Sequence, residues 1–581
     1  MSRRVWRSAL WYDDRVMQRL SRVGLISVGL VGVSSLVGGL VGSSVVAGSS
    51  QVGDRLRSYA QLMQTIQDEY VEETKSERLI ASSIGGMLHT LDPHSDFLEP
   101  REHSQLQERQ RGSYYGLGIS VQAIEGNITV ISPFEGSPAH RLGIRAGDII
   151  SRIDDGDARG MSIDEAVRRL KGPKGTSVKV TITRRGYDAP LEFTVIRDEI
   201  PLHAVPYSFM VTPRTGYVRL VDFNEVTACR PGSPATCEKE LERAIHTLKA
   251  QGASSLILDI RDNPGGLLDQ SFAVANLFLG KGQLVVYTRG RTARDESNYI
   301  TEGDSLCADL PLILLTSAHS ASASEIVAGA IQDHDRGLIV GERTFGKGLV
   351  QTILPLHSLR GYALQLTTAR YYTPSGRSIQ RDYGSTALED YYSASSRVGC
   401  AAPTGEPKLT AAGRKVYGGG GIAPDYCVEP ETPSKFVAYL DNRRAFFDFS
   451  MLYEAEDKIT SGQVGTAGVR SQQNSARVRP IRPDFDVDDR VWQEFRDFLK
   501  RAELRFTEED LTRERGALRV RILDEILRQV FGEAQARRRA VEWDPQVKKA
   551  LEVLPQATLL LRSPERYVAE YGSAGDHGVR P

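Results

Sequence analysis

"LPLILLTSAHSASASEIVAGAIQDH", residues 310–334, joins a continuous apolar run to a serine-rich loop and then to a periodic run. A continuous run such as "LILL" is typical of a strand buried on both faces of a sheet. In the periodic run, helical spacing separates apolar from polar side chains: Ile326, Val327, Ala330 and Ile331 against Glu325, Gln332 and Asp333. The stretch therefore predicts a buried strand, a short loop and an amphipathic helix.

The same alternation continues on both sides of this unit. "GYVRL", "SSLILDIR", "QLVVYT" and "RGLIVG" have strand patterns, whereas "CEKELERAIHTLKAQG" and "QSFAVANLFL" have helical patterns. Strands that alternate with helices are typical of a layered α/β core. We predict such a core over residues 201–430, with a loop-like part from about residue 386.

The length requires more than one domain. A single hydrophobic core stops growing at roughly 250 to 300 residues, and this chain has 581. Its composition, 40% hydrophobic and 25% charged, is that of an ordinary soluble protein. A net charge of −1 gives no basic excess to hold a phosphate backbone, so we expect no nucleic-acid partner.

The N-terminus has the pattern of an export segment. Six arginines in the first 22 residues precede an uncharged stretch, Val23–Ala47, and Val45-Val46-Ala47 offers small residues for cleavage. The stretch is also long enough to span a membrane. We therefore predict that residues 1–47 are a basic leader with a signal peptide or an inner-membrane anchor, and that the rest lies in the periplasm or cell envelope.

Five cysteines cannot all pair within one chain. Cys229 and Cys237 flank one short loop, and Cys400 and Cys427 bracket a turn-rich stretch, so each pair could close a disulfide in an oxidising compartment. Cys307 would then stay free. Five reduced thiols are the alternative, and no cysteine spacing resembles a zinc site.

Helical and β-rich segments precede the α/β core. Residues 54–100 have helical periodicity that Pro93 and Pro100 end. Residues 101–200 contain short β-branched runs between Gly and Pro signals. After the core, residues 434–581 return to helical periodicity around a polar linker near 461–483. The fold class is therefore multidomain α+β.

The β-rich segment resembles a PDZ domain. "YYGLGISV", "SPAHRLGIRAGDIISRID" and "AVRRLKGPKGTSVKVTI" carry the resemblance, with Gly116, Leu117, Gly118 and Ile119 at the carboxylate-binding loop. Glycines leave backbone N–H groups uncovered for a terminal carboxylate, and an exposed strand edge beside them can add a peptide strand. Taken alone, a G-x-G-x motif also fits a simple β-turn.

The serines at the start of the periodic run are candidates for chemistry. A serine at a strand-to-helix junction lies beside backbone N–H groups that have no partner within the helix and that could stabilise an oxyanion. Serine at this position is also a common N-cap, so the pattern alone leaves both roles open.

Lys347 is the candidate base. It lies between Gly346 and Gly348, whose missing side chains allow another backbone to come close. A solvated lysine is protonated and cannot act as a base, but burial lowers the pKa of an amine toward neutrality. A neutral Lys347 could then take the proton of a serine hydroxyl. A Ser–His site is the competing mechanism, but neither His319 nor His334 is well placed for it.

The core resembles the carboxyl-terminal processing peptidases, or tail-specific proteases, which are serine proteases with a PDZ domain. "GMLHTLDPHSDFLEP", "DIRDNPGG", "SASASEIVAGAIQDH", "GERTFGKGLVQ", "YYTPSGRSIQ" and "GRKVYGGGGIAPD" carry the resemblance over residues 54–430. It implies that Ser322 is the nucleophile, Lys347 the general base and Gln351 the amide that orients the base. The N–H groups of Gly266 and Ala323 would form the oxyanion hole, and Ser320 and Ser324 would be supporting residues.

The resemblance also implies the partners. We expect an exported endopeptidase that binds exposed C-termini of proteins or peptides, uses no metal or nucleotide cofactor and forms a homo-oligomer, with membrane attachment through residues 23–47 as an option. The alternative is a catalytically silent PDZ-type scaffold that binds peptides without cutting them. For His94 in "DPHSD", a capped turn is favoured over a metal site, because one histidine with two carboxylates is a poor ligand set.

Overall fold

The computed structural model describes residues 53–185, 187–230, 239–357, 359–384, 391–392, 399–400, 405–455 and 479–572. The predicted leader, residues 1–47, therefore lies outside the described residues. The chain divides into two compact units, one that ends at Leu91 and one that begins at Asp92. No helix within the described residues combines the length and the apolar character that a membrane span needs.

The first unit is helical, as predicted. Residues 53–69 form one helix, and α2 (Ser76–His89) forms the next. Many large apolar side chains of these helices and of the turn between them are exposed, whereas Leu88 is buried; the exposed ones are Leu56, Tyr59, Leu62, Ile66, Tyr70, Val71, Ile80 and Met87. The predicted helical periodicity does not extend to residue 100, because β1 (Asp96–Leu98) is a strand of the second unit that pairs with β18 (Ala363–Tyr372).

The PDZ-like segment is an antiparallel sheet with strand order β3-β4-β5-β7-β8, and β6 pairs with β5. The chain enters and leaves it through a paired β2 and β9 after helix α3. The elements are α3 (Pro100–Arg111), β2 (Ser113–Gly116), β3 (Ile119–Ile124), β4 (Asn127–Pro133), α4 (Pro138–Arg141), β5 (Ile149–Ile153), β6 (Gly156–Asp157), α5 (Ile163–Leu170), β7 (Ser177–Thr183), β8 (Leu191–Ile196) and β9 (Asp198–Pro201).

The α/β core is built, among the described residues, on a six-stranded sheet with strand order β10-β11-β12-β15-β16-β21. All neighbours are parallel except the edge strand β10, which pairs antiparallel with β11. The strands are β10 (Ser208–Thr212), β11 (Thr215–Arg219), β12 (Ser255–Asp259), β15 (Leu312–Thr316), β16 (Leu338–Gly341) and β21 (Tyr426–Cys427). This sheet confirms the predicted layered core.

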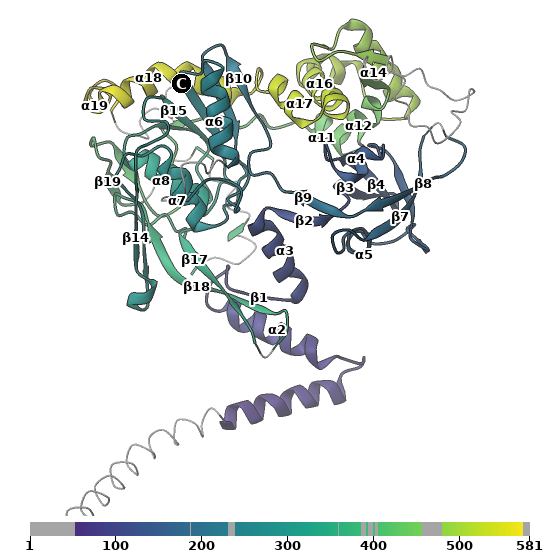
Figure 1. The fold of residues 1–581 in the computed structure, drawn as a ribbon, viewed down its shortest axis with the longest axis horizontal. Coiled ribbons are helices and arrows are strands. Elements are labelled where there is room, and N and C mark those ends of the chain that lie inside the picture. The colour runs from purple at the N-terminus through teal and green to yellow at the C-terminus, as the bar shows by residue number, and fades with distance from the viewer. Residues whose placement is uncertain are drawn as a thin grey trace, which may run out of the picture. The chain divides into compact units, whose positions relative to one another are not determined.

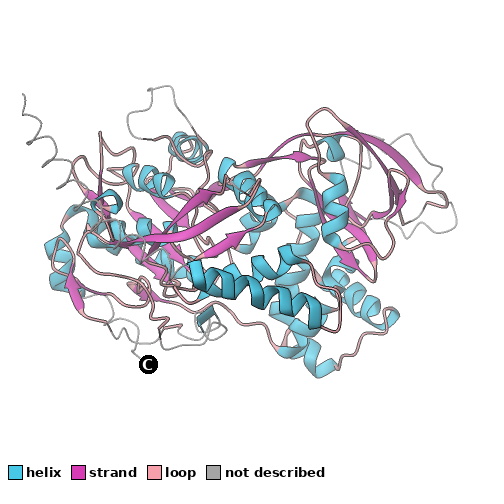
Figure 2. Cartoon of the chain, turned by 90° about the horizontal axis from the view of Figure 1, so that it is seen from below, coloured by secondary structure: helices cyan, strands magenta, loops and turns pink. Residues whose placement is uncertain are grey.

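Helices cover both faces of the six-stranded sheet. On one face, residues of α6 (Glu240–Ala250), α7 (Leu268–Asn276) and α8 (Ala323–Asp333) pack on Val218, Leu258 and Leu314. On the other face, α18 (Pro545–Arg562) and α19 (Pro564–Tyr571) pack on Tyr217, Ile257 and Ile313. The two sets alternate along β11, β12 and β15 as the strand period requires. Figures 1 and 2 show these layers from two directions.

A second sheet has strand order β1-β18-β13-β14, with β17 paired to β18. Its strands are β13 (Leu284–Gly290), β14 (Ser297–Ile300), β17 (Leu349–Pro355) and the long β18, and η1 (Ala293–Asp295) precedes β14. Helix α8 packs between β13 and β16, that is, between the two sheets. The helix forms where the sequence predicts it, but all eleven of its residues are buried, so its polar side chains as well as its apolar ones face protein.

The C-terminal region has two parts. Its first part has its own apolar core, which includes Phe449, Phe495 and Leu523. It contains α11 (Lys435–Asn442), α12 (Ala445–Ser450), β22 (Tyr453–Ala455), β23 (Arg479–Ile481), α14 (Asp489–Arg501), α15 (Glu508–Arg513), α16 (Arg515–Phe531) and α17 (Glu533–Ala540). The second part, α18 and α19, belongs to the α/β core. Strand β23 falls within the predicted linker, most of which lies outside the described residues.

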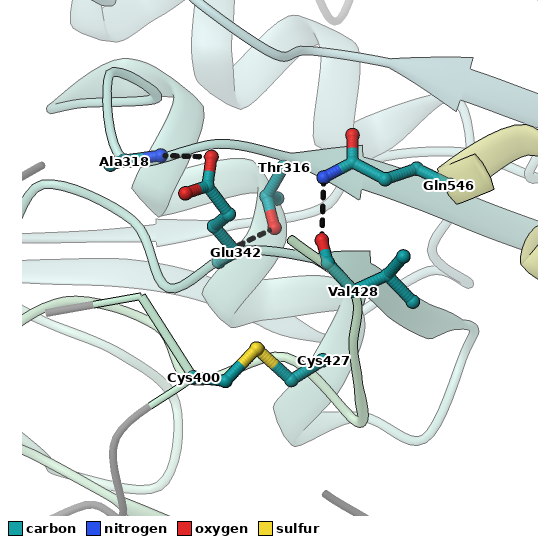
Figure 3. The surroundings of a disulfide bond; sticks show 7 residues. All are labelled: Thr316, Ala318, Glu342, Cys400, Cys427, Val428 and Gln546. Atoms are coloured by element: carbon teal, nitrogen blue, oxygen red, sulfur yellow. Dashed lines mark hydrogen bonds between the residues drawn. A yellow bond between two sulfur atoms is a disulfide. The ribbon is translucent and has the colours of Figure 1, made fainter. Parts of the chain in front are cut away.

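A disulfide joins Cys400 to Cys427, one of the two pairs that the sequence left open against five reduced thiols, and Cys307 is free, as that pairing implied, and buried. Cys229 is also disulfide-bonded, but Cys237 lies outside the described residues. Figure 3 shows the Cys400–Cys427 bond next to Val428, whose carbonyl accepts from Gln546 of α18. The segment between these cysteines contains the short strands β19 (Pro407–Leu409) and β20 (Lys415–Tyr417) where a loop was predicted.

Candidate active site

Ser322 lies at the junction between the β15 loop and α8. It is the N-cap of the helix and has φ +55° and ψ −112°, a conformation that non-glycine residues rarely adopt. Its N–H donates to Glu325 Oε2 at 2.8 Å. A strained residue that the surrounding structure holds in place is a common feature of active sites.

The neighbouring serines anchor this junction. Ser320 Oγ donates to Ile260 O, and Ser324 Oγ donates to Asn263 O, both at 2.8 Å. Both side chains are fully buried, whereas Ser322 is partly accessible. Of the three alternating serines, only Ser322 has a hydroxyl that donates no hydrogen bond to another described residue.

The loop that follows β12 presents Gly266 beside this junction. A Cβ atom on Gly265 would lie 2.9 Å from both Ala323 N and Ser322 Cβ, so the two backbones touch directly. One on Gly266 would lie 2.4 Å from Phe223 O. Both glycines have φ above +100°. Within the described chain, neither Gly266 N–H nor Ala323 N–H donates to another protein group.

Lys347 lies in the loop after β16, and Glu325 connects this loop to Ser322. The Glu325 carboxylate accepts from the N–H groups of Gly346 at 2.7 Å, Lys347 at 2.8 Å and Ser322 at 2.8 Å. It also accepts from Thr344 Oγ1 at 2.6 Å. The glycines next to Lys347 do allow close approach, because a Cβ on Gly346 would lie 3.0 Å from Gly421 N.

Tyr371 connects the same two loops from the other side. Its hydroxyl is within hydrogen-bond distance of Ser322 O, at 3.1 Å, and of Lys347 O. The ring is buried in the core beneath them. Glu325 and Tyr371 thus fix the two backbones, although no hydrogen bond between described atoms joins Ser322 Oγ to Lys347 Nζ.

Burial lowers the pKa of Lys347 below its ordinary value of 10.5. The Glu325 and Asp92 carboxylates act in the opposite direction but do not cancel the loss of solvation. Burial also raises the pKa of Glu325, to about 7, against the hydrogen bonds that stabilise its charged form. Burial therefore shifts Lys347 toward its neutral form, in which the amine can accept a proton.

The turn from Asp92 to Ser95 forms a wall near Lys347. Asp92 Oδ1 accepts from the N–H groups of His94 and Ser95, both at 2.8 Å, so the predicted capped turn is present. His94 is buried, and its Nε2 lies 3.0 Å from Tyr391 Oη. Burial and the nearby Lys347 lower the pKa of His94 to about 4, so this ring is neutral near pH 7.

Gln351, on β17, faces β18. Its Nε2 donates to Thr367 Oγ1 at 3.3 Å, and Thr367 N donates to Ser95 Oγ at 3.1 Å. Gln351 is therefore linked to the turn at Asp92, and no hydrogen bond between described atoms joins it to Lys347.

Neither of the other histidines considered from the sequence makes a hydrogen bond to Ser322 among the described atoms. His334 Nε2 lies 2.6 Å from Leu284 O, and His319 is exposed. In the part of the chain that is described, no group of three or more His, Cys, Asp and Glu side chains could hold a metal ion.

At the PDZ-like sheet, Gly118 has φ +74°, and a Cβ there would lie 2.3 Å from Ser137 Cβ. Ser137 Oγ donates to Gly118 O at 3.0 Å, so the loop from Gly116 to Ile119 is held from behind. Strand β3, which starts at Ile119, is an edge strand, and α5 packs beside it. An edge strand next to a helix is the arrangement that accepts an added peptide strand.

Two family models match the chain. The model of peptidase family S41 matches residues 214–387, and that of the PDZ domain matches residues 105–183. A carboxy-terminal-processing protease of Bartonella bacilliformis is 42% identical over 326 residues, which are 56% of this chain and 73% of that protein. This chain belongs to the carboxy-terminal processing proteases.

A further curated relative supports the same family for this carboxy-terminal processing protease. The carboxyl-terminal-processing protease of Synechocystis sp. is 36% identical over 54% of this chain and 72% of its own length. Among solved structures, the photosystem II D1 C-terminal processing protease is 31% identical, covers 56% of this chain and 84% of its own chain, and has a TM-score of 0.32. The protein is therefore a serine-type protease with a PDZ domain, which confirms the predicted family and enzyme class.

Sequence reasoning missed two residues of the site in this carboxy-terminal processing protease. Glu325 was assigned to the polar face of the helix with no role in the site, and Tyr371 was not noticed. One signal for Glu325 was available, because a carboxylate three residues after an N-cap serine can reach back to the N-cap N–H. No local pattern marks Tyr371, since its role depends on how β18 crosses the loops.

Proposed function

We propose that the protein is an exported endopeptidase that cuts peptide bonds with Ser322 as nucleophile and Lys347 as general base. The observation that carries this proposal is the pair of loops tied by Glu325, one presenting an accessible serine at a helix start and the other an amine whose pKa burial lowers.

In this mechanism Ser322 Oγ attacks the scissile carbonyl carbon while its proton passes to Lys347 Nζ. The carbonyl oxygen becomes an oxyanion, which the N–H groups of Gly266 and Ala323 bind. Lys347 then gives the proton to the leaving amine as the C–N bond breaks. A water molecule, deprotonated by Lys347, hydrolyses the acyl-enzyme and restores the hydroxyl. Gln351 would orient the amine.

Glu325 holds the backbones of Ser322 and Lys347 in a fixed relation, and in the proposed mechanism their side chains meet when substrate binds. Catalytic hydrogen bonds are often incomplete without substrate and form fully in the substrate complex.

The test is hydrolysis of a peptide with an apolar free C-terminus by purified protein, read by product mass. Ser322→Ala and Lys347→Ala should each abolish turnover and leave peptide binding intact, whereas Lys281→Ala, an exposed lysine, should behave as wild type. Full activity in either of the first two variants would refute the mechanism. Binding without cleavage by the wild-type protein would instead identify a silent scaffold.

The PDZ domain is proposed to bind the substrate's C-terminal tail. Its carboxylate would lie on the N–H groups of the loop from Gly116 to Ile119, and its chain would add to β3. Tail peptides with an amidated C-terminus should bind at least about tenfold more weakly than free acids, because the charged hydrogen-bond acceptor is lost. Equal affinities in a calorimetric titration would contradict this site.

Export is proposed from the basic and apolar pattern of residues 1–47, and the Cys400–Cys427 disulfide supports an oxidising compartment. We place the leader at 1–47, a helical segment from residue 54 to the end of α2 at His89, the PDZ domain at 101–200 and the protease core at 201–430, which α18 and α19 complete; the rest of 434–581 is a separate helical region. Whether residues 23–47 are cut or anchor the protein is decided by N-terminal sequencing of the envelope fraction. Full-length protein in the cytosol would contradict export.

Self-association is proposed through the exposed apolar side chains of the first unit, among them Leu62 and Ile66. A second copy of this surface is a partner of matching chemistry, and closed homo-oligomers are the common form of association. Leu62→Glu combined with Ile66→Glu should lower the mass measured by light scattering. An unchanged mass would place the contact elsewhere or show a monomer.

A further inference from the structure

The C-terminal helix α18 covers the second face of the protease sheet. Val547, Ala550, Val553 and Leu560 are buried against strand residues that include Ile257 and Ile313. Figure 1 shows α18 lying over β15, more than two hundred residues earlier in the chain. Without this helix, the apolar side chains on that face would meet water.

The start of α18 contacts Arg261. This residue begins the segment from Arg261 to Gly266, here called the oxyanion loop because it carries the Gly266 N–H. Arg261 Nη1 donates to Asp544 Oδ2 at 2.7 Å and to Gln546 Oε1 at 2.8 Å. The other side of the same guanidinium donates to the buried Asp259 carboxylate, with Nη2 to Oδ2 at 2.6 Å. Arg261 is thus held from two directions, by the end of β12 and by α18.

The five residues after Arg261 lead directly to Gly266. Asp262 N donates to Ser317 Oγ at 2.8 Å, and Asn263 O accepts from Ala321 N at 3.0 Å and from Ser324 Oγ at 2.8 Å. These bonds join the loop rigidly to the serine junction. A shift of Arg261 would therefore be transmitted to the Gly266 N–H.

We propose that Asp544 and Gln546 are positioning residues of this protease, which hold the oxyanion loop through Arg261 and make α18 part of the catalytic apparatus. The inference rests on the proposed role of Gly266. A planar guanidinium held at two edges by hydrogen bonds has a fixed orientation. If the contact with α18 is lost, the N–H of Gly266 is no longer fixed where the oxyanion forms.

Asp544→Asn separates this role from helix stability. Asp544 is the N-cap of α18, where Oδ1 accepts from Gln546 N at 2.8 Å. Asparagine caps helices about as well as aspartate. With its one oxygen on the helix, however, its NH₂ group would face the guanidinium, and two donors cannot bond to each other. Gln546→Ala removes the second acceptor.

The experiment measures kcat, KM and the urea midpoint of full-length protein, together with inhibition by a peptide boronic acid, which forms a tetrahedral adduct with a reactive serine. In Asp544→Asn, and more so combined with Gln546→Ala, kcat should fall at least about tenfold with KM within twofold, since small misplacements have large kinetic effects. Boronate affinity should fall in parallel, and PDZ tail affinity should not change. Glu552→Gln, in an exposed pair on the same helix, is the matched control and should act as wild type.

An unchanged kcat in folded Asp544→Asn with Gln546→Ala would overturn the inference, as would a loss of activity that only follows the unfolded fraction. Failure of the proposed function looks different. If Ser322→Ala remains active, the assigned nucleophile is wrong. If Ser322→Ala is inactive and the α18 variants match wild type, only the positioning role is wrong.

Discussion

At the scale of single residues, Glu325 controls the site most strongly. Its buried carboxylate accepts four hydrogen bonds, three of them from the backbones that carry Ser322 and Lys347. A carboxylate without these donors would be costly to bury, and the donors without the carboxylate would be unsatisfied. The position of the proposed nucleophile and base relative to each other thus depends on the Glu325 side chain, together with Tyr371.

Glu325→Gln should reduce kcat by at least about a hundredfold, because the amide places an NH₂ group against N–H donors and separates the loops. The free energy of unfolding should fall by about 1–3 kcal/mol, the cost of leaving buried donors without acceptors. Steady-state kinetics and urea denaturation measure the two effects. Wild-type kinetics in this variant would show that the carboxylate is not needed to hold the loops together.

The pH dependence should report Lys347. Because the neutral amine is the proposed base, kcat/KM should rise with pH as Lys347 loses its proton below its ordinary pKa of 10.5, in a range where Glu325, whose pKa burial raises to about 7, also titrates. Glu325, Asp92 and His94 interact electrostatically with Lys347, and His94 is neutral above pH 5. The Asp92 carboxylate raises the pKa of Lys347, so Asp92→Asn should move the acid limb to lower pH.

Asparagine can still accept from the turn N–H groups, so this variant is expected to keep the Asp92–Ser95 turn. A pH–rate profile from pH 5 to 10 for both proteins is the measurement. A shift toward higher pH, or a profile independent of pH, would contradict a neutral lysine as base.

At the scale of elements, the hydrophobic periodicity of the sequence predicted the type and position of several strands and helices. Strands β12 and β15 are continuous apolar runs because both faces of their sheet are covered, and α8 was placed correctly along the chain. The hairpin of β17 and β18 was not predicted, since its residues are mostly half-buried and alternate weakly. The burial of α8's polar side chains was also missed, because the partners that satisfy them come from distant segments.

The buried ion pairs of Arg414 are an example of contacts between separate segments that stabilise the α/β core. Arg414 is fully buried and pairs with Asp335 Oδ1 at 2.5 Å and with Asp425 Oδ1 at 2.7 Å. Arg414→Met should lower the free energy of unfolding by about 3–5 kcal/mol, because two carboxylates lose their counter-charge. Lys408→Met, which breaks an exposed pair with Glu406, should cost under about 1 kcal/mol. Urea denaturation measures the loss in free energy of unfolding for each variant. Equal losses would show that the buried cluster is not held by ion pairs.

At the scale of the whole molecule, the length of the chain predicted several domains, and the order of the motifs predicted the order of those domains along the chain. The split of the C-terminal region was not predictable, because α16, which helps form a separate core, and α18, which completes the protease sheet, have the same helical periodicity. The periodicity of a helix tells that one face is buried but not against what.

The Cys400–Cys427 disulfide closes a long segment that packs next to the loop of Lys347, the proposed base. Within this segment, Ile422 N donates to Thr344 Oγ1 at 2.7 Å, and Gly421 abuts the Thr344 carbonyl directly before the Lys347 loop. A cross-link between residues 27 apart lowers the conformational entropy of the unfolded chain and so stabilises the folded protein by about 3 kcal/mol. Cys400→Ser combined with Cys427→Ser should therefore lower the free energy of unfolding by about that amount and reduce kcat, since the packing against Thr344 loosens.

Urea denaturation and peptide hydrolysis measure both effects, first on the oxidised wild-type protein and then after reduction. Reduction should bring the wild type close to the double serine variant, whereas the variant should respond to reduction only through the disulfide that Cys229 makes. An oxidised wild type that matches the variant in both stability and kcat would show that the segment holds the Lys347 loop without its cross-link.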